Sequence, residues 1–205
     1  MISASRDRLT SDSPADLPVD TVRLLRVDGV PFEAVLEEWV GPKLFSSELR
    51  DGSLHRLGER WSGLARHRRS DHLVVGRIAD SDSELEYGAF VMEPGLGRLL
   101  LVDIEDGQER FVNSGLGAFL RCVDAFVAWW DGLIREPKSV GPDSDERLGR
   151  QVEFIGARLS GIDPESMQDP DSYWPLWLED LRSPCAARRA RSWSAMSSSV
   201  VDGGA

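Results

Sequence analysis

The stretch RFVNSGLGAFLRCVDAFVAWWDG, residues 110–132, decides the fold, because it changes from a strand pattern to a helix pattern within a few residues. From Leu116, which lies between two glycines, large apolar residues recur at steps of three and four, which is typical of an amphipathic helix. They are Leu116, Phe119, Leu120, Val123, Phe126, Val127 and Trp130. Burying seven such side chains contributes roughly 10–20 kcal/mol of gross stabilisation, so we expect this helix to be the central packing element. Cys122 falls within the same stripe, which favours a core residue over a nucleophile.

A strand, a glycine turn and a helix N-terminus can also bind a phosphate. The dinucleotide-binding fingerprint needs a third glycine, however, and Leu120 stands at that position. It also needs a parallel βαβ unit, whereas the preceding strands have connections too short for parallel pairing. The side-chain oxygens of Asn113 and Ser114 are well suited to cap a helix, so the sequence favours a capped helix over a nucleotide site.

Four strand patterns precede this helix, at residues 72–79, 85–94, 97–105 and 108–113. Their short connections predict an antiparallel meander, because only antiparallel neighbours can be joined by so few residues. Since side chains alternate along a strand, Leu100, Val102 and Ile104 share one face of the third strand, and we expect that face to be core. The other face turns acidic at Asp103 and Glu105.

Helical spacing of apolar residues recurs in three other segments, at 31–40, 144–160 and 172–181. Residues 44–70 contain weak strand signals that do not settle an order. The sequence therefore predicts an α+β domain over residues 21–182, in which helices pack on one face of an antiparallel meander sheet. Residues 1–20 and 183–205 are rich in Ser, Asp, Pro, Ala and Gly, and we expect both to be disordered tails.

Composition narrows the function classes. The chain of 205 residues has the length of one domain with a sizeable core. Its start lacks the apolar run of a signal peptide, and no stretch of about 18 apolar residues could span a membrane, so we expect a soluble, cytoplasmic protein without a membrane partner. Two cysteines supply neither a disulfide framework nor a cysteine-rich zinc site.

The net charge of −11 is concentrated in residues 71–110, which hold ten carboxylates against three arginines. Nucleic acid would be repelled by such a region, because its affinity for proteins comes largely from cations. A basic protein would be attracted to it. If residues 80–86 are extended, Asp80, Asp82, Glu84 and Glu86 fall on one side as unpaired carboxylates. This ladder is either a solvated hairpin edge or a docking surface for cations.

The sequence contains no convincing metal or catalytic site. DSDSELEYG at residues 80–88 begins like a calcium loop, but Leu85 occupies the position that requires glycine. His67, Asp71 and His72 are close in sequence, but their spacing matches no helical ligand pair. No Ser or Cys has an evident base partner, so we expect no metal, no cofactor and no enzymatic activity.

Several phrases of the chain resemble the SUKH superfamily of immunity proteins, in particular its fourth branch. They are LVVGRI, YGAFVME and GRLLLVDIEDG, followed by FVNSGLGAFLRCVDAF and, near the end, IDPES and YWPLWLEDL. The most recognisable feature is Phe111-Val112-Asn113-Ser114 followed by Leu116, Phe119 and Leu120, and this motif is structural. The resemblance covers residues 70–182 well and 21–69 loosely, and Gly115 stands where the branch often has another small residue.

The resemblance implies a non-enzymatic α+β domain that binds and neutralises a cognate toxin, commonly a nuclease or deaminase, of bacterial polymorphic toxin systems. A basic toxin would be attracted to the acidic region. We expect the toxin to bind nucleic acid, whereas this chain binds only the toxin. A scaffold or regulator that binds a cellular protein is the alternative, and a small-molecule or nucleotide-binding enzyme is the third. We expect the partner-binding residues among Asp80, Asp82, Glu84, Glu86, Asp103, Glu105 and Asp106, with Trp129 as an aromatic anchor unless it packs in the core.

Overall fold

The computed structural model of the chain describes residues 6–9, 17–31, 33–34, 45–49, 53–79, 86–135 and 144–182. Its main sheet is antiparallel, in the order β3-β4-β6-β7-β8-β9, with β5 also paired to β6. The strands are β3 (Glu33–Ala34), β4 (Phe45–Ser47), β5 (His55–Arg56), β6 (Leu73–Ala79), β7 (Glu86–Met92), β8 (Leu99–Asp103) and β9 (Glu109–Asn113). Consecutive strands β6 to β9 are neighbours, as short connections dictate, so the α+β class and the meander are confirmed.

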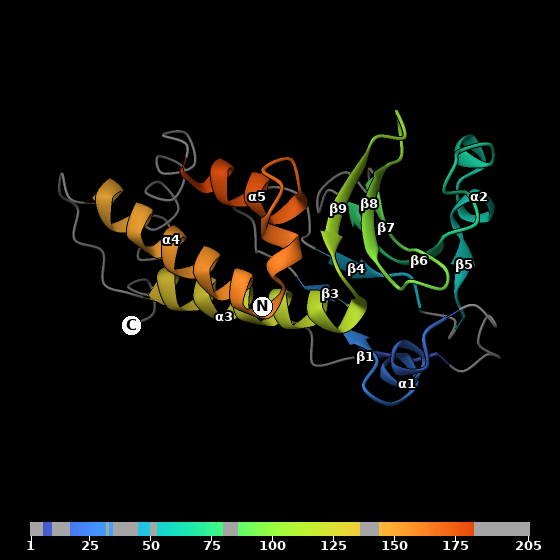
Figure 1. The fold of residues 1–205 in the computed structure, drawn as a ribbon, viewed down its shortest axis with the longest axis horizontal. Coiled ribbons are helices and arrows are strands. Elements are labelled where there is room, and N and C mark those ends of the chain that lie inside the picture. Colours follow the sequence, from blue (N-terminus) through green and yellow to red (C-terminus); the bar gives the residue numbers. More distant parts are fainter. Residues whose placement is uncertain are drawn as a thin grey trace, which may run out of the picture.

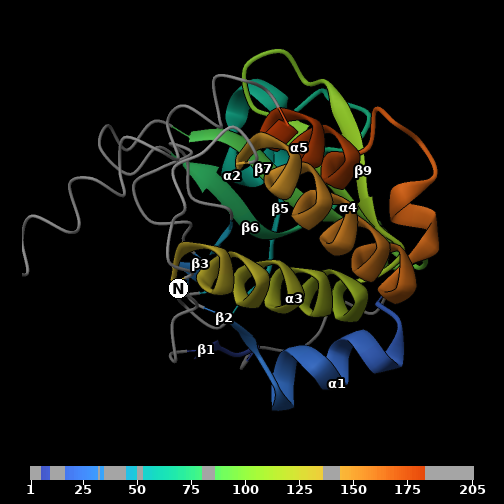
Figure 2. The same ribbon diagram turned by 90° about the vertical axis from the view of Figure 1, so that its left-hand side faces the viewer.

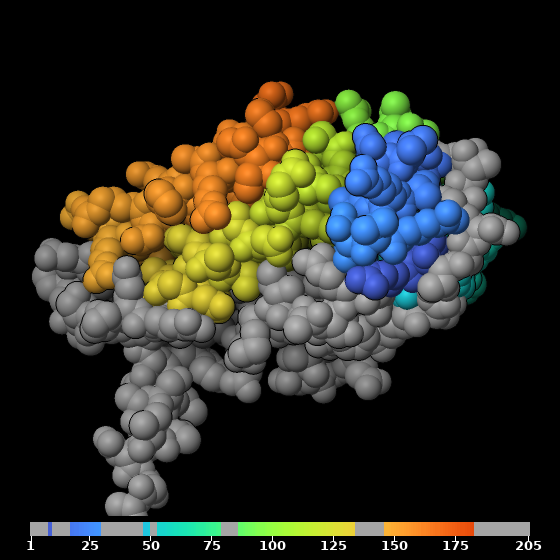
Figure 3. Space-filling view, turned by 90° about the horizontal axis from the view of Figure 1, so that it is seen from below, coloured from blue at the N-terminus to red at the C-terminus, as the bar shows by residue number. Residues whose placement is uncertain are grey.

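The longer helices gather on one side of the sheet, and a short helix covers the other (Figure 1). The helical segments are α1 (Val19–Val27), α2 (Leu57–Arg60), η1 (Ser62–Leu64), α3 (Leu116–Arg135), α4 (Ser144–Ile162), η2 (Pro164–Met167) and α5 (Tyr173–Arg182). Figure 2 shows α3 between α1 on one side and α4 with α5 on the other. Seen from below, α1 covers one end of α3, and α4 runs along its flank (Figure 3).

The central helix is buried over more of its circumference than the stripe predicts. All seven stripe residues are buried, and so are Ala118, Cys122, Ala125 and Trp129. Contact with α1 on one side and α4 on the other explains the difference, since helices on both sides leave only a narrow solvent face. Burial raises the pKa of the Cys122 thiol to about 11, which keeps it protonated and unreactive and agrees with a core role.

The predicted core face of β8 is confirmed at Leu100 and Val102, which are buried, but the opposite face is core as well. Leu99 lies in the large core with α3, and Leu101 packs against that core. Leu100 and Val102 instead join a second, smaller cluster with Leu57 of α2 and Leu64 of η1. Both faces are apolar here, because α2 and η1 cover the side opposite the long helices. Alternation shows which residues share a face, but it does not show which face receives which helices.

The helix predicted at 31–40 is wrong where the structure describes it. Val30–Pro31 form β2, which pairs with β1 (Arg6–Asp7), and Glu33–Ala34 form β3, which pairs with β4. Residue 32 and residues 35–44 lie outside the described residues. The N-terminal helix is instead α1, whose Leu25 is fully buried beside Leu9 in the large core. The domain boundary at residue 21 stays a prediction, although these contacts begin before it.

Candidate partner-binding surface

The turn between β8 and β9 presents carboxylates on a defined backbone. Asp103 Oδ1 accepts the backbone N–H groups of Glu105 (2.8 Å) and Asp106 (3.2 Å), and Asp106 Oδ1 accepts that of Gln108 (2.8 Å). Such local bonds favour a turn over a longer strand. They fix the backbone of the turn, and the Glu105 and Asp106 side chains are exposed.

A hydrogen bond from His67, a residue outside the turn, also stabilises the turn. His67 lies just after η1, and its Nδ1 accepts the N–H of Arg69 (3.2 Å). Its Nε2 therefore carries the proton and donates to the carbonyl of Gly107 (2.9 Å). Gly107 has a φ of 72°, and a Cβ there would stand 2.9 Å from His67 Cδ2, so both conformation and space require glycine. His67 is a structural contact of the turn, whereas Asp71 pairs through its Oδ1 with His72 Nδ1 (3.1 Å).

Glu86 does not belong to an unpaired ladder. It lies in an ion-pair network with Arg60 (3.2 Å) and Arg77, and its Oε2 accepts the indole N–H of Trp61 (2.7 Å). Glu48 completes the network through Arg60 (3.0 Å) and Arg77 (2.9 Å). The expectation that Glu86 is available to a partner is therefore wrong, because two arginines from β6 and α2 already neutralise it.

Replacing Glu86 with glutamine should lower the free energy of unfolding by about 1–2 kcal/mol, because Arg60 and Arg77 would then share only Glu48. The loss should shrink at high salt, where exposed ion pairs are screened. Urea unfolding at low and at high salt measures both effects. Glu105→Gln is the matched control, since Glu105 is an exposed carboxylate without a recorded ion pair in the described residues; an equal loss there would contradict the network's role.

Other carboxylates of residues 71–110 are also neutralised. Burial alone would raise the pKa of Glu109, but hydrogen bonds and charges from Arg68 and Arg69 outweigh it and lower the pKa. Arg69 also lies 3.5 Å from Glu93. Asp80, Asp82 and Glu84 lie outside the described residues. Within the described part, the carboxylates of the predicted set without an ion pair are those of Asp103, Glu105 and Asp106.

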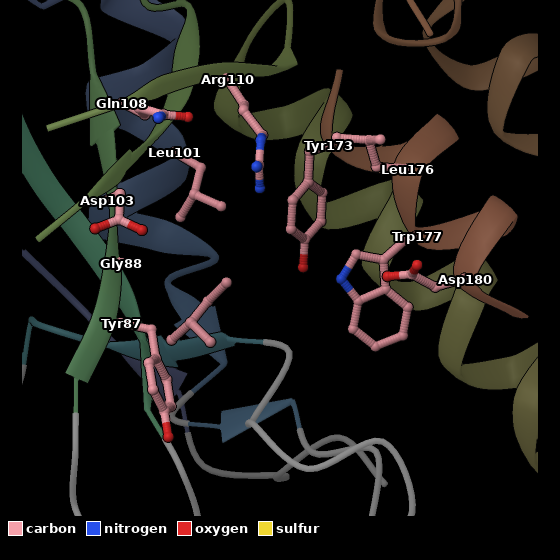
Figure 4. Close-up of a pocket in the computed structure, with 11 residues that line it drawn as sticks. Tyr87, Gly88, Leu101, Asp103, Gln108, Arg110, Tyr173, Leu176, Trp177 and Asp180 are labelled. Carbon is pink, nitrogen blue, oxygen red and sulfur yellow. The ribbon is translucent and has the colours of Figure 1, made fainter. Parts of the chain in front are cut away.

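A pocket of about 250 Å³ opens beside this turn, between strands β6 to β9 and α5. Figure 4 shows Arg110 of β9 and Tyr173 of α5 extending into it from two sides, with Trp177 and Asp180 along one flank. The other lining residues are Ile78, Tyr87, Gly88, Leu101, Asp103, Gln108 and Leu176. Asp103 thus belongs both to the acidic turn and to the pocket wall, so the two features form one continuous surface.

Sequence reasoning missed the pocket residues of α5. Tyr173, Leu176, Trp177 and Asp180 stand at positions i, i+3, i+4 and i+7, so they share one face of the helix. That spacing was a usable signal, but it overlaps the stripe of Trp174, Leu178 and Leu181, which packs in the core. Which of two adjoining stripes faces a groove depends on the sheet opposite.

Asn113 does not cap α3. Its Oδ1 accepts the indole N–H of Trp174 (2.9 Å), and its Nδ2 donates to Asp163 Oδ2 (2.8 Å). The backbone N–H of Ser114 donates to the same carboxylate oxygen (2.8 Å). Gly115, whose carbonyl accepts the N–H of Phe119, stands at the N-cap position instead. Leaving the buried polar groups of Trp174 and Asp163 unpaired would cost more free energy than leaving the helix end without a side-chain cap. Asn113 therefore belongs to a tertiary hydrogen-bond network.

The residues of this network come from the phrases that carry the family resemblance. Comparison with family models matches residues 12–180, most of the chain, to the SUKH-4 immunity protein model. The chain belongs to the SUKH-4 immunity protein family. No curated protein and no solved structure matches it. In this SUKH-4 domain the motif residues Asn113, Leu116 and Phe119 are all buried, so the motif holds the fold together.

Trp129 is no anchor in this SUKH-4 protein. It is 7% exposed, packs on Phe126 and Trp130, and donates its indole N–H to Gln151 of α4 (3.3 Å). It joins α3 to α4, which agrees with the core alternative. No described helix of the domain is long and apolar enough to cross a membrane. The described side chains also contain no group of three His, Cys, Asp or Glu that could hold a metal ion.

Proposed function

We propose that this SUKH-4 protein is a non-enzymatic immunity protein that binds and neutralises a basic, nucleic-acid-targeting toxin in the cytoplasm. The observation that carries the proposal is the turn at Asp103, Glu105 and Asp106, whose carboxylates have no ion pair among the described residues. A nuclease or deaminase needs cations to hold its substrate, because phosphate contacts dominate nucleic-acid affinity. An acidic partner can cover those cations and is steered toward them.

The rigidity of the turn supports this role. The bond from His67 and the two Asx-type interactions define its backbone before any partner arrives. A surface that is already ordered loses little conformational entropy on association, so more of its interaction energy appears as affinity. The neutralised carboxylates, Glu86 and Glu109, instead stabilise the strands that carry the turn.

The proposal predicts a tight complex with the product of the adjacent gene, weakening steeply as salt is raised. The reason is that the attraction is between net charges, which salt screens. Calorimetric titration at low and physiological ionic strength measures the affinity, and a nucleic-acid cleavage or deamination assay measures the neutralisation. The absence of a complex at low salt, with both proteins folded, would reject the proposed function.

A further inference from the structure

The pocket beside the acidic turn combines apolar walls with carboxylates at its rim. Leu101 and Ile78 line the sheet side, and Trp177 lines the helix side. The Trp177 ring is held edge-on against Phe126, with the ring centroids 5.5 Å apart at 84°, so its position is fixed by the core. Asp103 and Asp180 flank the pocket from β8 and α5 (Figure 4).

A buried polar group at this pocket has unused hydrogen-bonding capacity. Tyr173 is 3% exposed, and its hydroxyl has no hydrogen-bond partner of good geometry among the described residues, although the Trp177 indole N–H is close enough to oppose the effect of burial on its pKa. Burial raises the pKa of Tyr173 far above its usual range, so the hydroxyl is neutral and can accept or donate a hydrogen bond. Figure 4 shows the hydroxyl directed into the space between Arg110 and Trp177. A hydroxyl carries one proton and two lone pairs, so the Tyr173 hydroxyl can still bond to an occupant of the pocket.

The size of the pocket limits that occupant. Sites for drug-sized molecules and cofactors enclose about 300–1,000 Å³, and this pocket is smaller at about 250 Å³. A nucleotide is therefore disfavoured, and a single side chain is the better fit. The pocket suits a side chain with an apolar stem and a polar end. Its walls include the apolar Leu101 and Trp177, and its rim includes the carboxylates of Asp103 and Asp180.

We infer that the pocket receives one arginine side chain of the partner toxin. Its stem would pack on Leu101, its guanidinium plane would stack on Trp177, and its N–H groups would reach Asp180, Asp103 and the Tyr173 hydroxyl. The lining carries two carboxylates against one guanidinium, that of Arg110, so a cation balances its charge and an anion would not. This inference rests on the proposed function for the basic nature of the partner.

The charge of Arg110 distinguishes a cationic occupant of the pocket from an anionic one. It is exposed, it enters the pocket, and it forms no ion pair among the described residues. If the occupant were a carboxylate, Arg110 would be its main attraction. For an arginine occupant, Arg110 is a like charge that weakens binding, and the two carboxylates offset its repulsion. Removing its charge therefore has opposite effects on the two kinds of ligand.

The test uses blocked amino acids and needs no toxin, so its outcome is separate from that of the proposed function. N-acetylarginine amide, its neutral isostere N-acetylcitrulline amide and N-acetylglutamate amide are titrated into the full chain. Binding is followed by NMR at the Trp177 indole N–H, which is assigned with Trp177→Phe. We expect the arginine probe to bind with a dissociation constant on the order of 1–10 mM, as its size allows. The citrulline probe should bind about fivefold more weakly.

Two variants of exposed residues complete the test, with unchanged melting temperatures as the folding control. Asp180→Asn should weaken the arginine probe by about 3–5-fold, and Arg110→Gln should strengthen it by about 2–3-fold. Preferential binding of the glutamate probe, abolished by Arg110→Gln, would overturn the inference and make the pocket a carboxylate site. No shift of the Trp177 signal at about 50 mM arginine probe would also overturn it.

Discussion

Replacing Asn113 with alanine should lower the free energy of unfolding by about 3–5 kcal/mol. The change deletes the acceptor of the Trp174 indole N–H and one donor to the Asp163 carboxylate. Both groups are buried, so water cannot replace the lost bonds without opening the core. Chemical denaturation followed by tryptophan fluorescence measures the loss.

Ser114→Ala is the matched control. Ser114 contributes to the network through its backbone N–H, which alanine keeps, and its side chain is exposed. We therefore expect a loss of less than about 1 kcal/mol. If Ser114→Ala proved as costly as Asn113→Ala, a helix cap by either side chain would explain the motif better than the buried network. If neither variant were destabilised, the network would be irrelevant to stability.

The second large effect concerns association. Changing Glu105 to lysine and Asp106 to asparagine in one variant should slow association with the proposed basic toxin at least about tenfold at low salt. Asparagine keeps an Oδ1 acceptor for the N–H of Gln108, so the turn should retain its shape while its charge rises by three. Stopped-flow mixing over a range of ionic strengths separates this electrostatic effect from a change in contacts, since only the former disappears at high salt.

The control for that variant changes the net charge by the same amount, but at residues of the helices. Glu153→Lys with Asp124→Asn alters two exposed residues of α4 and α3, also by three charges. If only net charge mattered, both variants would slow association equally. A slower rate for the turn variant alone would support an interface at the turn. Wild-type rates for both would place the interface elsewhere.

Much of the fold follows from local pattern. The stripe from Leu116 to Trp130 predicts α3, and alternating residues with tight connections predict strands β6 to β9, because both signals depend on neighbours in sequence. The failures involve contacts between distant segments. Residues 31–40 carry a helical spacing, but in the described part of this segment, pairing of Val30–Pro31 with β1 and of Glu33–Ala34 with β4 outweighs it.

The candidate site was only partly predictable for the same reason. The acidic turn is continuous in sequence, so the sequence alone shows that its carboxylates are neighbours. Glu86 looked identical to its neighbours, yet Arg60 and Arg77 reach it from other elements. The pocket joins residues of β8 and β9 to residues of α5, more than sixty positions away. A sequence gives the charge of such residues, whereas their pairing depends on the tertiary arrangement.

The bond between His67 and the Gly107 carbonyl has a consequence for how such a protein can change its target. It fixes the turn through backbone atoms and a residue forty positions earlier, and it involves none of the side chains at 104–106. The side chains at 104 and 105 can therefore be exchanged while the loop keeps its shape, whereas position 106 needs an oxygen acceptor for the N–H of Gln108. A lineage facing a new toxin could alter the charge and size of this turn at position 105 in single steps, and position 106 could alternate between Asp and Asn. Gly107 and His67 would stay fixed meanwhile.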